Sequence, residues 1–425
     1  MAFPLLLSKL LIRSGFPGWI PSARRLVGNG LGYLHYYSDR VLTAPAADVL
    51  SAAALLELHA GDGIDLAMGS PRFDLTPSGS TKLPADQRDW PPPGGLPELR
   101  AAVADKLHSD YGQPFDPTSE VLITSGATGA LHVALETFVN HGDSVVLFDP
   151  TSPLYPLAVR AHGGRVRWVT TWSVEGRTRF HDARLAQLLR GAKLLILTAP
   201  ANPSGCVFSP DDLEQIAWWA NRRDVLLYID EVFERFLYDG EPMTVATLPT
   251  ARNRTLTAGS VSKGHALAAA RVGWLAGCRH LLRPCSLMAA LYAPFVPTLC
   301  QQIALTALRQ EDHLFEAIHS AFEARRRYAV ERLQSMGLRP TWPAGGYFLW
   351  IPVWELDYSG QDFAARLLRE QKVLVTPGDL FGPSGKGYVR LSFAADDGRL
   401  REGLRRLEVF LRQCAGASAE VPQAA

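Results

Sequence analysis

Lys263 is the residue of this sequence whose surroundings most clearly suggest chemistry. It lies in the segment GSVSKGHALAAARVGW (259–274), preceded by Ser260 and Ser262 and followed by Arg271. A lysine at this place could be an ordinary surface cation with its aliphatic stem laid on a sheet. It could also be a reactive amine in a pocket, because the small residues around it leave room for a ligand. The segment alone does not decide between these interpretations.

Three other segments place polar groups directly after apolar runs. SGATGA (125–130) follows VLIT and opens a helix, so its free backbone N–H groups and the helix dipole suit a phosphate. Asp230 ends the apolar run VLLYID, where a carboxylate is costly unless a cation satisfies it. Asn202 lies in PANPSG after KLLILT, and a lone asparagine there could simply form a turn. One ligand would explain the phosphate cradle, the amide, the carboxylate and the amine together.

The elements that must position these residues alternate regularly beyond residue 60. Short apolar runs predict strands at 121–124, 144–149, 165–172, 193–200, 225–230, 255–260 and 271–277, and amphipathic helices such as 211–223 lie between several of them. This alternation predicts an α/β fold, with a mostly parallel seven-stranded sheet covered by helices on both faces. Active sites of such sheets lie beyond the carboxyl ends of the strands, which is where Lys263, Asp230 and Asn202 fall.

The length of the chain predicts more than one domain. Its 425 residues exceed the ~250 to 300 at which a single hydrophobic core stops growing. From about residue 311 a long charged helical pattern leads into short strands and two further helices, which predicts a smaller α+β domain. We expect an N-terminal arm with helices at 1–60, a large domain at 61–310, and a small domain at 311–425 that includes part of the N-terminal segment.

Composition limits the kinds of partner and the cellular compartment that we expect. The formal charge of +1 gives no reason to expect a nucleic-acid partner. The sequence contains no zinc-type spacing of cysteine and histidine, so we expect no metal site. Five cysteines without a CxxC pair favour a reducing compartment, the cytoplasm. The apolar start MAFPLLLSKLLIRSGF is shorter than the ~20 residues of a membrane-spanning helix. We expect it to pack on the protein or on a second subunit; a helix lying on a membrane surface is the less favoured alternative.

Taken in order, these motifs resemble those of the fold-type-I, aspartate-aminotransferase-like family of class I/II aminotransferases. The similarity runs from about residue 65 to 393 and covers most of the chain. The matching segments are DLAMGSP, GLPELRAAVA, SGATGAL, ANPSG, YIDEVF, SVSK with an arginine eight residues on, and YVRLSF. The resemblance implies the pyridoxal phosphate (PLP) transferase fold of type I and PLP as cofactor.

The resemblance also implies a role for each matched residue. Lys263 is expected to form the Schiff base with the cofactor and then to carry the proton of the substrate Cα. Asp230 is expected to pair with the pyridine nitrogen and Asn202 to donate to the ring oxygen O3′. The expected phosphate ligands are Ser260, Ser262, Arg271 and the backbone of Ala127 and Thr128. Lys263 and Asp230 are thus the predicted catalytic residues.

The substrate carboxylate is expected to lie against Arg390 of YVRLSF. A guanidinium holds a carboxylate through two parallel hydrogen bonds, which fixes the orientation of the Cα–H bond. An exposed salt-bridge partner on an edge strand is the alternative for Arg390. The backbone of Gly69 and the side chain of Asn202 are expected to complete the substrate site.

The sequence departs from the family pattern around the cofactor ring. Phe233 stands where the family commonly has a tyrosine that donates to O3′, so one donor is missing. Ser152 stands where an aromatic residue usually stacks on the ring, and Tyr155 could substitute for it if the loop is rebuilt. Trp90 occupies the position of a tyrosine that reaches the neighbouring subunit's phosphate, and an indole has only one N–H to donate. The cofactor chemistry is therefore more firmly predicted than the reaction type.

Transamination between an amino acid and a 2-oxo acid is the favoured function, because the lysine and the carboxylate-binding arginine are both present. A PLP-dependent lyase acting on an amino acid is the second hypothesis. In such an enzyme the carbanion formed when the substrate Cα loses its proton expels a leaving group from the side chain. A non-catalytic sensor with an aminotransferase-like domain is the third, but residues 1–60 contain no recognisable helix-turn-helix. The family further implies a homodimer with shared active sites.

Overall fold

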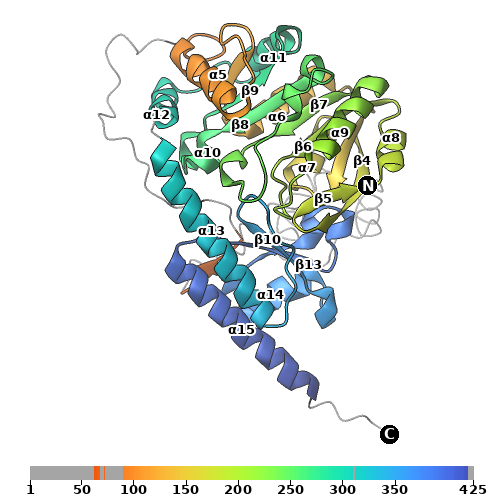
Figure 1. The fold of residues 1–425 in the computed structure, drawn as a ribbon, viewed down its shortest axis with the longest axis vertical. Coiled ribbons are helices and arrows are strands. Elements are labelled where there is room, and N and C mark those ends of the chain that lie inside the picture. Colours follow the sequence, from red (N-terminus) through yellow and green to blue (C-terminus); the bar gives the residue numbers. More distant parts are fainter. Residues whose placement is uncertain (1–61, 68–70, 72–89, 310–311, 420–425) are drawn as a thin grey trace, which may run out of the picture. The chain divides into compact units, whose positions relative to one another are not determined.

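The computed structural model describes residues 62–67, 71, 90–309 and 312–419 (Figure 1). All of these belong to one compact unit of the chain. The predictions for the N-terminal arm at 1–60 and for Gly69 lie outside the described residues.

An eight-stranded sheet forms the framework of the larger part (Figure 1). Its strands, in spatial order, are β2 (Val121–Thr124), β9 (Gly273–Gly277), β8 (Thr255–Ser260), β7 (Leu226–Asp230), β6 (Ala192–Thr198), β3 (Ser144–Asp149), β4 (Arg165–Val174) and β5 (Arg177–Phe180). The run from β8 to β4 is parallel, whereas β9 is antiparallel to both of its neighbours. The predicted α/β fold with a mostly parallel sheet is confirmed, and each of the seven predicted strands is present.

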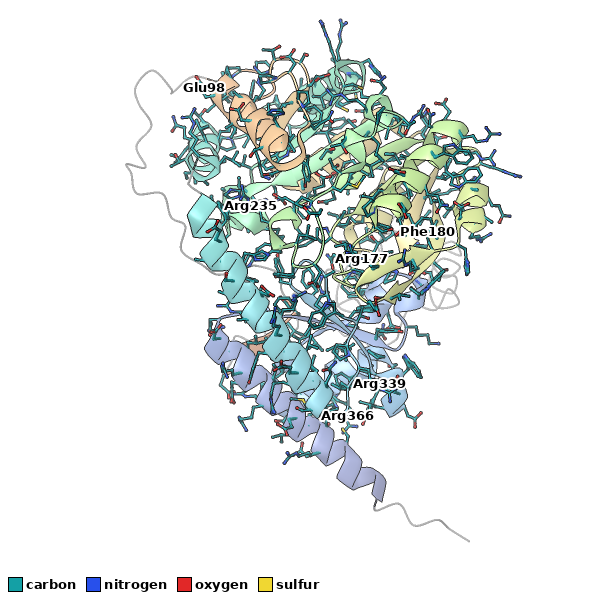
Figure 2. The ribbon with its side chains drawn as sticks, viewed as in Figure 1. Glu98, Arg177, Phe180, Arg235, Arg339 and Arg366 are labelled. Atoms are coloured by element: carbon teal, nitrogen blue, oxygen red, sulfur yellow. The ribbon has the colours of Figure 1, made fainter. Side chains whose placement is uncertain are left out.

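The eighth strand, β5, was not predicted because its sequence RTRF lacks an apolar run. It pairs with the end of β4 as an antiparallel hairpin through Glu175 and Gly176, both with positive φ (48° and 76°). Two such residues form the turn whose twist matches a β-hairpin. Phe180 packs its ring against Phe148 of β3, with ring centroids 5.5 Å apart, and is labelled in Figure 2.

Helices cover both faces of the sheet, as predicted. On one face lie α6 (Gly126–Phe138), α7 (Leu154–Ala161) and α11 (Arg279–Tyr292), and on the other α8 (Asp182–Leu188) and α9 (Pro210–Arg223). Near β2 and β9, α5 (Pro97–Tyr111) packs with α12 (Thr298–Leu308). The start of α9 illustrates how the sequence sets a boundary: Ser209 and Asp212 bond each other's backbone N–H in a capping box.

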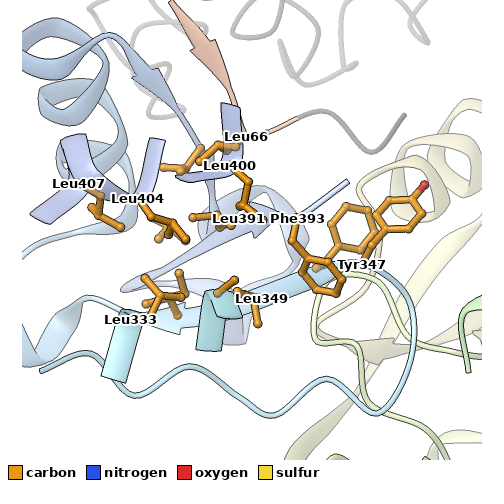
Figure 3. Close-up of a cluster of buried hydrophobic side chains, with 14 of the residues drawn as sticks. Leu66, Leu333, Tyr347, Leu349, Leu391, Phe393, Leu400, Leu404 and Leu407 are labelled. Carbon is orange, nitrogen blue, oxygen red and sulfur yellow. The ribbon is translucent and has the colours of Figure 1, made fainter. Parts of the chain in front are cut away.

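A three-stranded antiparallel sheet forms the framework of the smaller part, in the order β10 (Phe348–Pro352), β13 (Tyr388–Ser392) and β12 (Thr376–Pro377). It packs with α13 (Asp312–Ser335), α14 (Gly360–Gln371) and α15 (Asp397–Ala419) around a separate core. Figure 3 shows part of this core, including Leu349, Leu391 and Leu404, each fully buried.

The smaller part also contains residues from before position 70. β1 (Ile64–Asp65) pairs in parallel with β11 (Val373–Leu374), and Leu66 lies in the same core. This agrees with the expected α+β character, while the exact boundary at residue 310 stays a prediction. No helix among the described residues is both long and apolar enough to cross a membrane.

Candidate cofactor and substrate site

Three neighbouring strands bring polar residues to one edge of the large sheet. β6 ends at Thr198, β7 at Asp230 and β8 at Ser260. The chain passes from β8 directly into α10 (Val261–Gly264), which carries Lys263. Because β6, β7 and β8 are parallel, their carboxyl ends lie side by side. The fold therefore brings the lysine and the aspartate to the same edge.

Lys263 is half-buried, and burial together with nearby positive charges lowers the pKa of its amine. Desolvation lowers its pKa to about 8; the positive charges of Arg390 and Arg271 act in the same direction, whereas Asp230 opposes them. An amine with a pKa near the working pH can act as nucleophile and can both accept and release a proton. The charges that act on Lys263 thus come from both the large and the small sheet.

Asp230 is a carboxylate that is only 5% exposed. The Tyr155 hydroxyl donates to its Oδ2 at 2.8 Å, and the Val232 backbone N–H donates to its Oδ1 at 3.2 Å. Burial nevertheless raises the pKa of Asp230 to about 6, because two hydrogen bonds do not replace the lost hydration. A cation placed against this carboxylate would stabilise its ionised form and lower this pKa.

Tyr155 has a different place from the one that sequence reasoning considered for it. Its hydroxyl donates to Asp230 and accepts a hydrogen bond from Thr198 Oγ1 at 2.8 Å, and its ring lies in the core below the strand ends. Sequence reasoning missed Thr198 altogether. The only available signal was physical: a buried aspartate needs donors, and hydroxyl residues stand at the end of β6 and soon after β3.

Arg390 projects from β13 of the small sheet toward the same strand ends. Its Nη1 donates to Asn202 Oδ1 at 2.8 Å, and its Nη2 donates to the Ala67 carbonyl oxygen at 2.8 Å and to Thr376 Oγ1 at 3.4 Å. These three acceptors are uncharged. The contact with Asn202 joins two of the predicted substrate-binding residues directly.

Two aromatic rings enclose the Arg390 guanidinium. Its Cζ atom lies 4.1 Å from the centroid of the Phe348 ring and 4.8 Å from that of Phe381. Desolvation lowers the pKa of Arg390 to about 10, and its buried Nε has no hydrogen-bond partner among the described residues. A desolvated cation with a spare donor and neutral partners is suited to an incoming carboxylate.

The start of α6 forms a closely packed cradle with β9 and Arg271. Gly126 has a φ of +68°, and a Cβ atom there would lie 2.6 Å from Arg271 Nη2. A Cβ atom at Gly273 would lie 2.7 Å from the backbone nitrogen of Ala127. Ser125 makes no side-chain cap, so the first N–H groups of α6 are not capped by that residue. Glycines therefore let an arginine and a helix N-terminus converge, an arrangement that suits a phosphate.

The remaining predicted phosphate ligands lie in the neighbouring segments. Ser260 and Ser262 are buried where β8 passes into α10, and Ser260 Oγ accepts a hydrogen bond from the Ser262 N–H at 3.3 Å. Thr128 lies in the first turn of α6 and is half-buried. Their bonds to a phosphate stay predictions.

Phe233 and Ser152 are the predicted cofactor contacts that the geometry supports least. Phe233 lies in the core of the smaller part and packs edge-on against Tyr347 and Phe348, with ring centroids 5.3 and 5.6 Å apart. Ser152 is half-buried in the segment between β3 and α7. Both roles stay predictions. Trp90, expected to reach a neighbouring subunit, is 80% exposed and lies against Phe295 with ring centroids 5.0 Å apart.

Comparison with known proteins agrees with this geometry. The family profile for aminotransferase class I and II matches residues 62–407. An aspartate aminotransferase of Pyrococcus abyssi is 32% identical over 84% of this chain and 95% of its own. An arginine–pyruvate transaminase of Pseudomonas aeruginosa is 32% identical over 85% and 94%. The solved structure of Thermus thermophilus aspartate aminotransferase with maleate, 30% identical, superposes with a TM-score of 0.81 over 88% of this chain and 99% of that one.

The chain belongs to the class I and II aminotransferase family. It is a pyridoxal-phosphate-dependent enzyme that transfers amino groups, and its fold is that of the fold-type-I aminotransferases. The predicted family, fold, cofactor and reaction class are confirmed. The hypothesis of a non-catalytic sensor is set aside.

Proposed function

We propose that Lys263, Asp230, Asn202 and Arg390, together with the start of α6, form the active site of this aminotransferase. The observation that carries the proposal is the convergence of three groups at the end of three parallel strands: a lysine with a lowered pKa, a buried carboxylate, and a guanidinium whose hydrogen-bond acceptors are uncharged. PLP fits this set, because a cation beside Asp230 would lower its raised pKa, and the glycines let Arg271 approach the start of α6 so that both can contact one anion. When bound, PLP supplies the electron sink that stabilises a negative charge at the substrate Cα.

The protein groups divide the remaining tasks. Asp230 would hold the ring nitrogen in its protonated form, and Tyr155 orients that carboxylate by its hydrogen bond. The phosphate would be held by Arg271, Ser260, Ser262 and the N–H groups at the start of α6. Asn202, whose Oδ1 accepts a hydrogen bond from Arg390, would donate its amide N–H to the cofactor ring oxygen.

Lys263 moves the proton at the substrate Cα. With a pKa of about 8, a useful fraction of the amine is neutral near neutral pH and can accept this proton, then return it at another atom. Arg390 binds the α-carboxylate and so orients the Cα–H bond toward the lysine. The aromatic rings of Phe348 and Phe381 exclude water from the guanidinium, which strengthens its hold on a carboxylate.

We further propose that the substrates are an α-amino acid and a 2-oxo acid and that the enzyme is a cytoplasmic homodimer. One relative is named as an aspartate aminotransferase and another as an arginine–pyruvate transaminase, and both are 32% identical to this chain. Similarity at this level therefore does not identify the side chain of the amino-acid substrate. The α-carboxylate common to all amino acids is the group for which Arg390 is suited. The lack of CxxC pairs supports a reducing compartment.

Half-reactions of the purified, PLP-loaded enzyme test the proposal. Incubation with single amino acids should give the 2-oxo acid and pyridoxamine phosphate without release of ammonia. Borohydride reduction followed by peptide mass spectrometry should place the cofactor on Lys263. Lys263→Ala should abolish turnover, and Lys193→Ala, which alters an exposed lysine on β6, should not. Ammonia as the main product, or labelling of another lysine, would overturn it.

A further inference from the structure

A buried carboxylate at the end of β3 clamps the small sheet to the large one. Asp149 is 2% exposed, and its Oδ1 accepts a hydrogen bond from Ser384 Oγ at 2.7 Å. The Ser384 backbone N–H also donates to this carboxylate, at 3.1 Å to Oδ2 and 3.2 Å to Oδ1. Ser384 belongs to the short 3-10 helix Pro383–Gly385, which follows the helix Gly378–Phe381 next to β12.

Another hydrogen bond runs in the opposite direction beside those between Ser384 and Asp149. The Thr151 backbone N–H, two residues beyond Asp149, donates to the Phe381 carbonyl oxygen at 2.8 Å. Gly382 has a φ of +126°, and a Cβ atom at this position would collide with Asp149 Oδ1. The two segments are therefore fitted closely enough that only glycine is accommodated at position 382.

Each side of this contact leads to a group of the proposed active site. Phe381 stacks its ring on the Arg390 guanidinium and lies 5.5 Å, between centroids, from Trp350. On the other side, the segment after Thr151 enters α7, where Tyr155 holds Asp230. These contacts thus link Phe381, which packs on the proposed substrate-binding Arg390, to the segment that leads to Tyr155, which donates to Asp230.

We propose that Asp149 and Ser384 are positioning residues that set the distance between Arg390 and the Lys263–Asp230 edge, and thereby the affinity for the amino acid. This inference rests on the proposed roles of Arg390, Lys263 and Asp230. Binding of a carboxylate by a guanidinium and proton transfer by an amine require a fixed separation, and a displacement of ~1 Å is costly. A buried, charge-assisted clamp fixes that separation before the substrate arrives.

Ser384→Ala tests the proposal, with Ser359→Ala as a matched control. Ser359 Oγ also donates to an aspartate, Asp362, at 2.7 Å, but Ser359 is the N-cap of α14 and Asp362 lies in the first turn of that helix. Ser384→Ala should raise KM for the amino acid about tenfold, while the Kd for PLP changes by less than about twofold. Ser359→Ala should leave both constants unchanged. Asp149→Asn, which keeps the shape of the side chain but removes its charge, should shift KM in the same direction as Ser384→Ala.

Hydrogen exchange of the cofactor-free protein provides a readout that needs no activity. The Thr151 amide, which donates to Phe381, should exchange faster in Ser384→Ala than in the wild type and in Ser359→Ala. The proposal is overturned if both serine variants leave KM unchanged or raise it equally, or if the Thr151 amide stays equally protected. Failure of the wild type to bind PLP or transfer amino groups would instead overturn the proposed function, and the exchange data would still report on the clamp.

Discussion

At the scale of single residues, Arg390 combines a desolvated charge with uncharged hydrogen-bond partners. A cation in this state gains most from a carboxylate that can take two of its N–H groups. Its pKa, lowered to about 10, still leaves it protonated at neutral pH. The charge is thus held ready for a substrate.

Replacing Arg390 should therefore weaken amino-acid binding selectively. Arg390→Ala is expected to cost about 3 kcal/mol or more in transition-state binding, since each charge-assisted hydrogen bond contributes about 1.5 to 3 kcal/mol. Arg390→Lys should lose part of this, because an ammonium lacks the paired geometry. The measurement is kcat/KM for an amino acid and for the matching amine without a carboxylate. Equal losses for both would remove Arg390 from the substrate site; Arg339→Ala, at an exposed site labelled in Figure 2, is the control.

Tyr155 should control the pH range over which PLP binds. The pKa of Asp230 is about 6, above its ordinary value of 3.8, so affinity for a ring cation is complete above pH 6 and is lost as the pH falls through 6. The Tyr155 hydrogen bond lowers this pKa. Tyr155→Phe removes it, so the pKa of Asp230 rises further and the loss of affinity begins at a higher pH.

Equilibrium dialysis of PLP across the pH range checks this expectation. The cofactor phosphate also titrates in this range, but it does so equally for both proteins and cancels in their comparison. Tyr328→Phe, at a half-buried residue on α13, is the control. Superimposable curves for Tyr155→Phe and the wild type would show that the hydroxyl does not act on Asp230.

The sequence predicted the chemical types at the site better than their contacts. Lys263 and Asp230 could be recognised because each ends or follows an apolar run, where a buried charge is costly unless it is satisfied. Arg390 lies within the segment YVRLSF and was identified only by the match of that segment to the family motif. The hydrogen bond between Tyr155 and Asp230 joins residues that are 75 positions apart, and that between Arg390 and Asn202 joins residues 188 apart. Such pairings depend on how the strands are ordered, which periodicity does not specify.

At the scale of elements, the junction of β2 and α6 depends on glycine. The sequence pattern predicted the turn between these two elements correctly, because strands of a buried parallel sheet are continuous apolar runs that end where the turn begins. The charged hairpin strand β5 and the two-residue strand β12 lack that signal. What the pattern could not show is that Gly126 and Gly273 let the helix start approach Arg271.

Gly126→Ala should accordingly damage the phosphate site more than the fold. The new Cβ would push Arg271 away from the first N–H groups of α6, and affinity for PLP should fall about tenfold or more. Gly112→Ala is a matched control, because Gly112 has nearly the same φ, +67°, with nothing within 4 Å of the added carbon. Both variants carry the strain of a left-handed residue, about 1 kcal/mol, which thermal unfolding should report equally. Equal PLP affinities for the two would exclude the phosphate from this junction.

At the scale of the whole molecule, α11 presents apolar side chains to solvent. Leu287 and Leu291 are 62% and 68% exposed, and they stand four residues apart on one face of the helix. Tyr292 and Trp90 are 68% and 80% exposed. Large exposed apolar side chains that gather on one helix favour contact with another protein surface. The proposed homodimer supplies such a surface from a second copy of the chain.

Leu291→Asp should therefore shift the enzyme from dimer to monomer. A carboxylate buried without a partner at a two-fold interface would occur twice, once in each subunit, so its cost is doubled. Sedimentation equilibrium should show a dimer for the wild type and a dissociation constant raised at least about a hundredfold for the variant, corresponding to ~2.7 kcal/mol. Trp218→Asp, at a 49% exposed aromatic residue on α9, should leave the dimer intact. Because the family resemblance implies shared active sites, PLP affinity should fall together with dimerisation. A Leu291→Asp protein that remains dimeric would place the interface elsewhere.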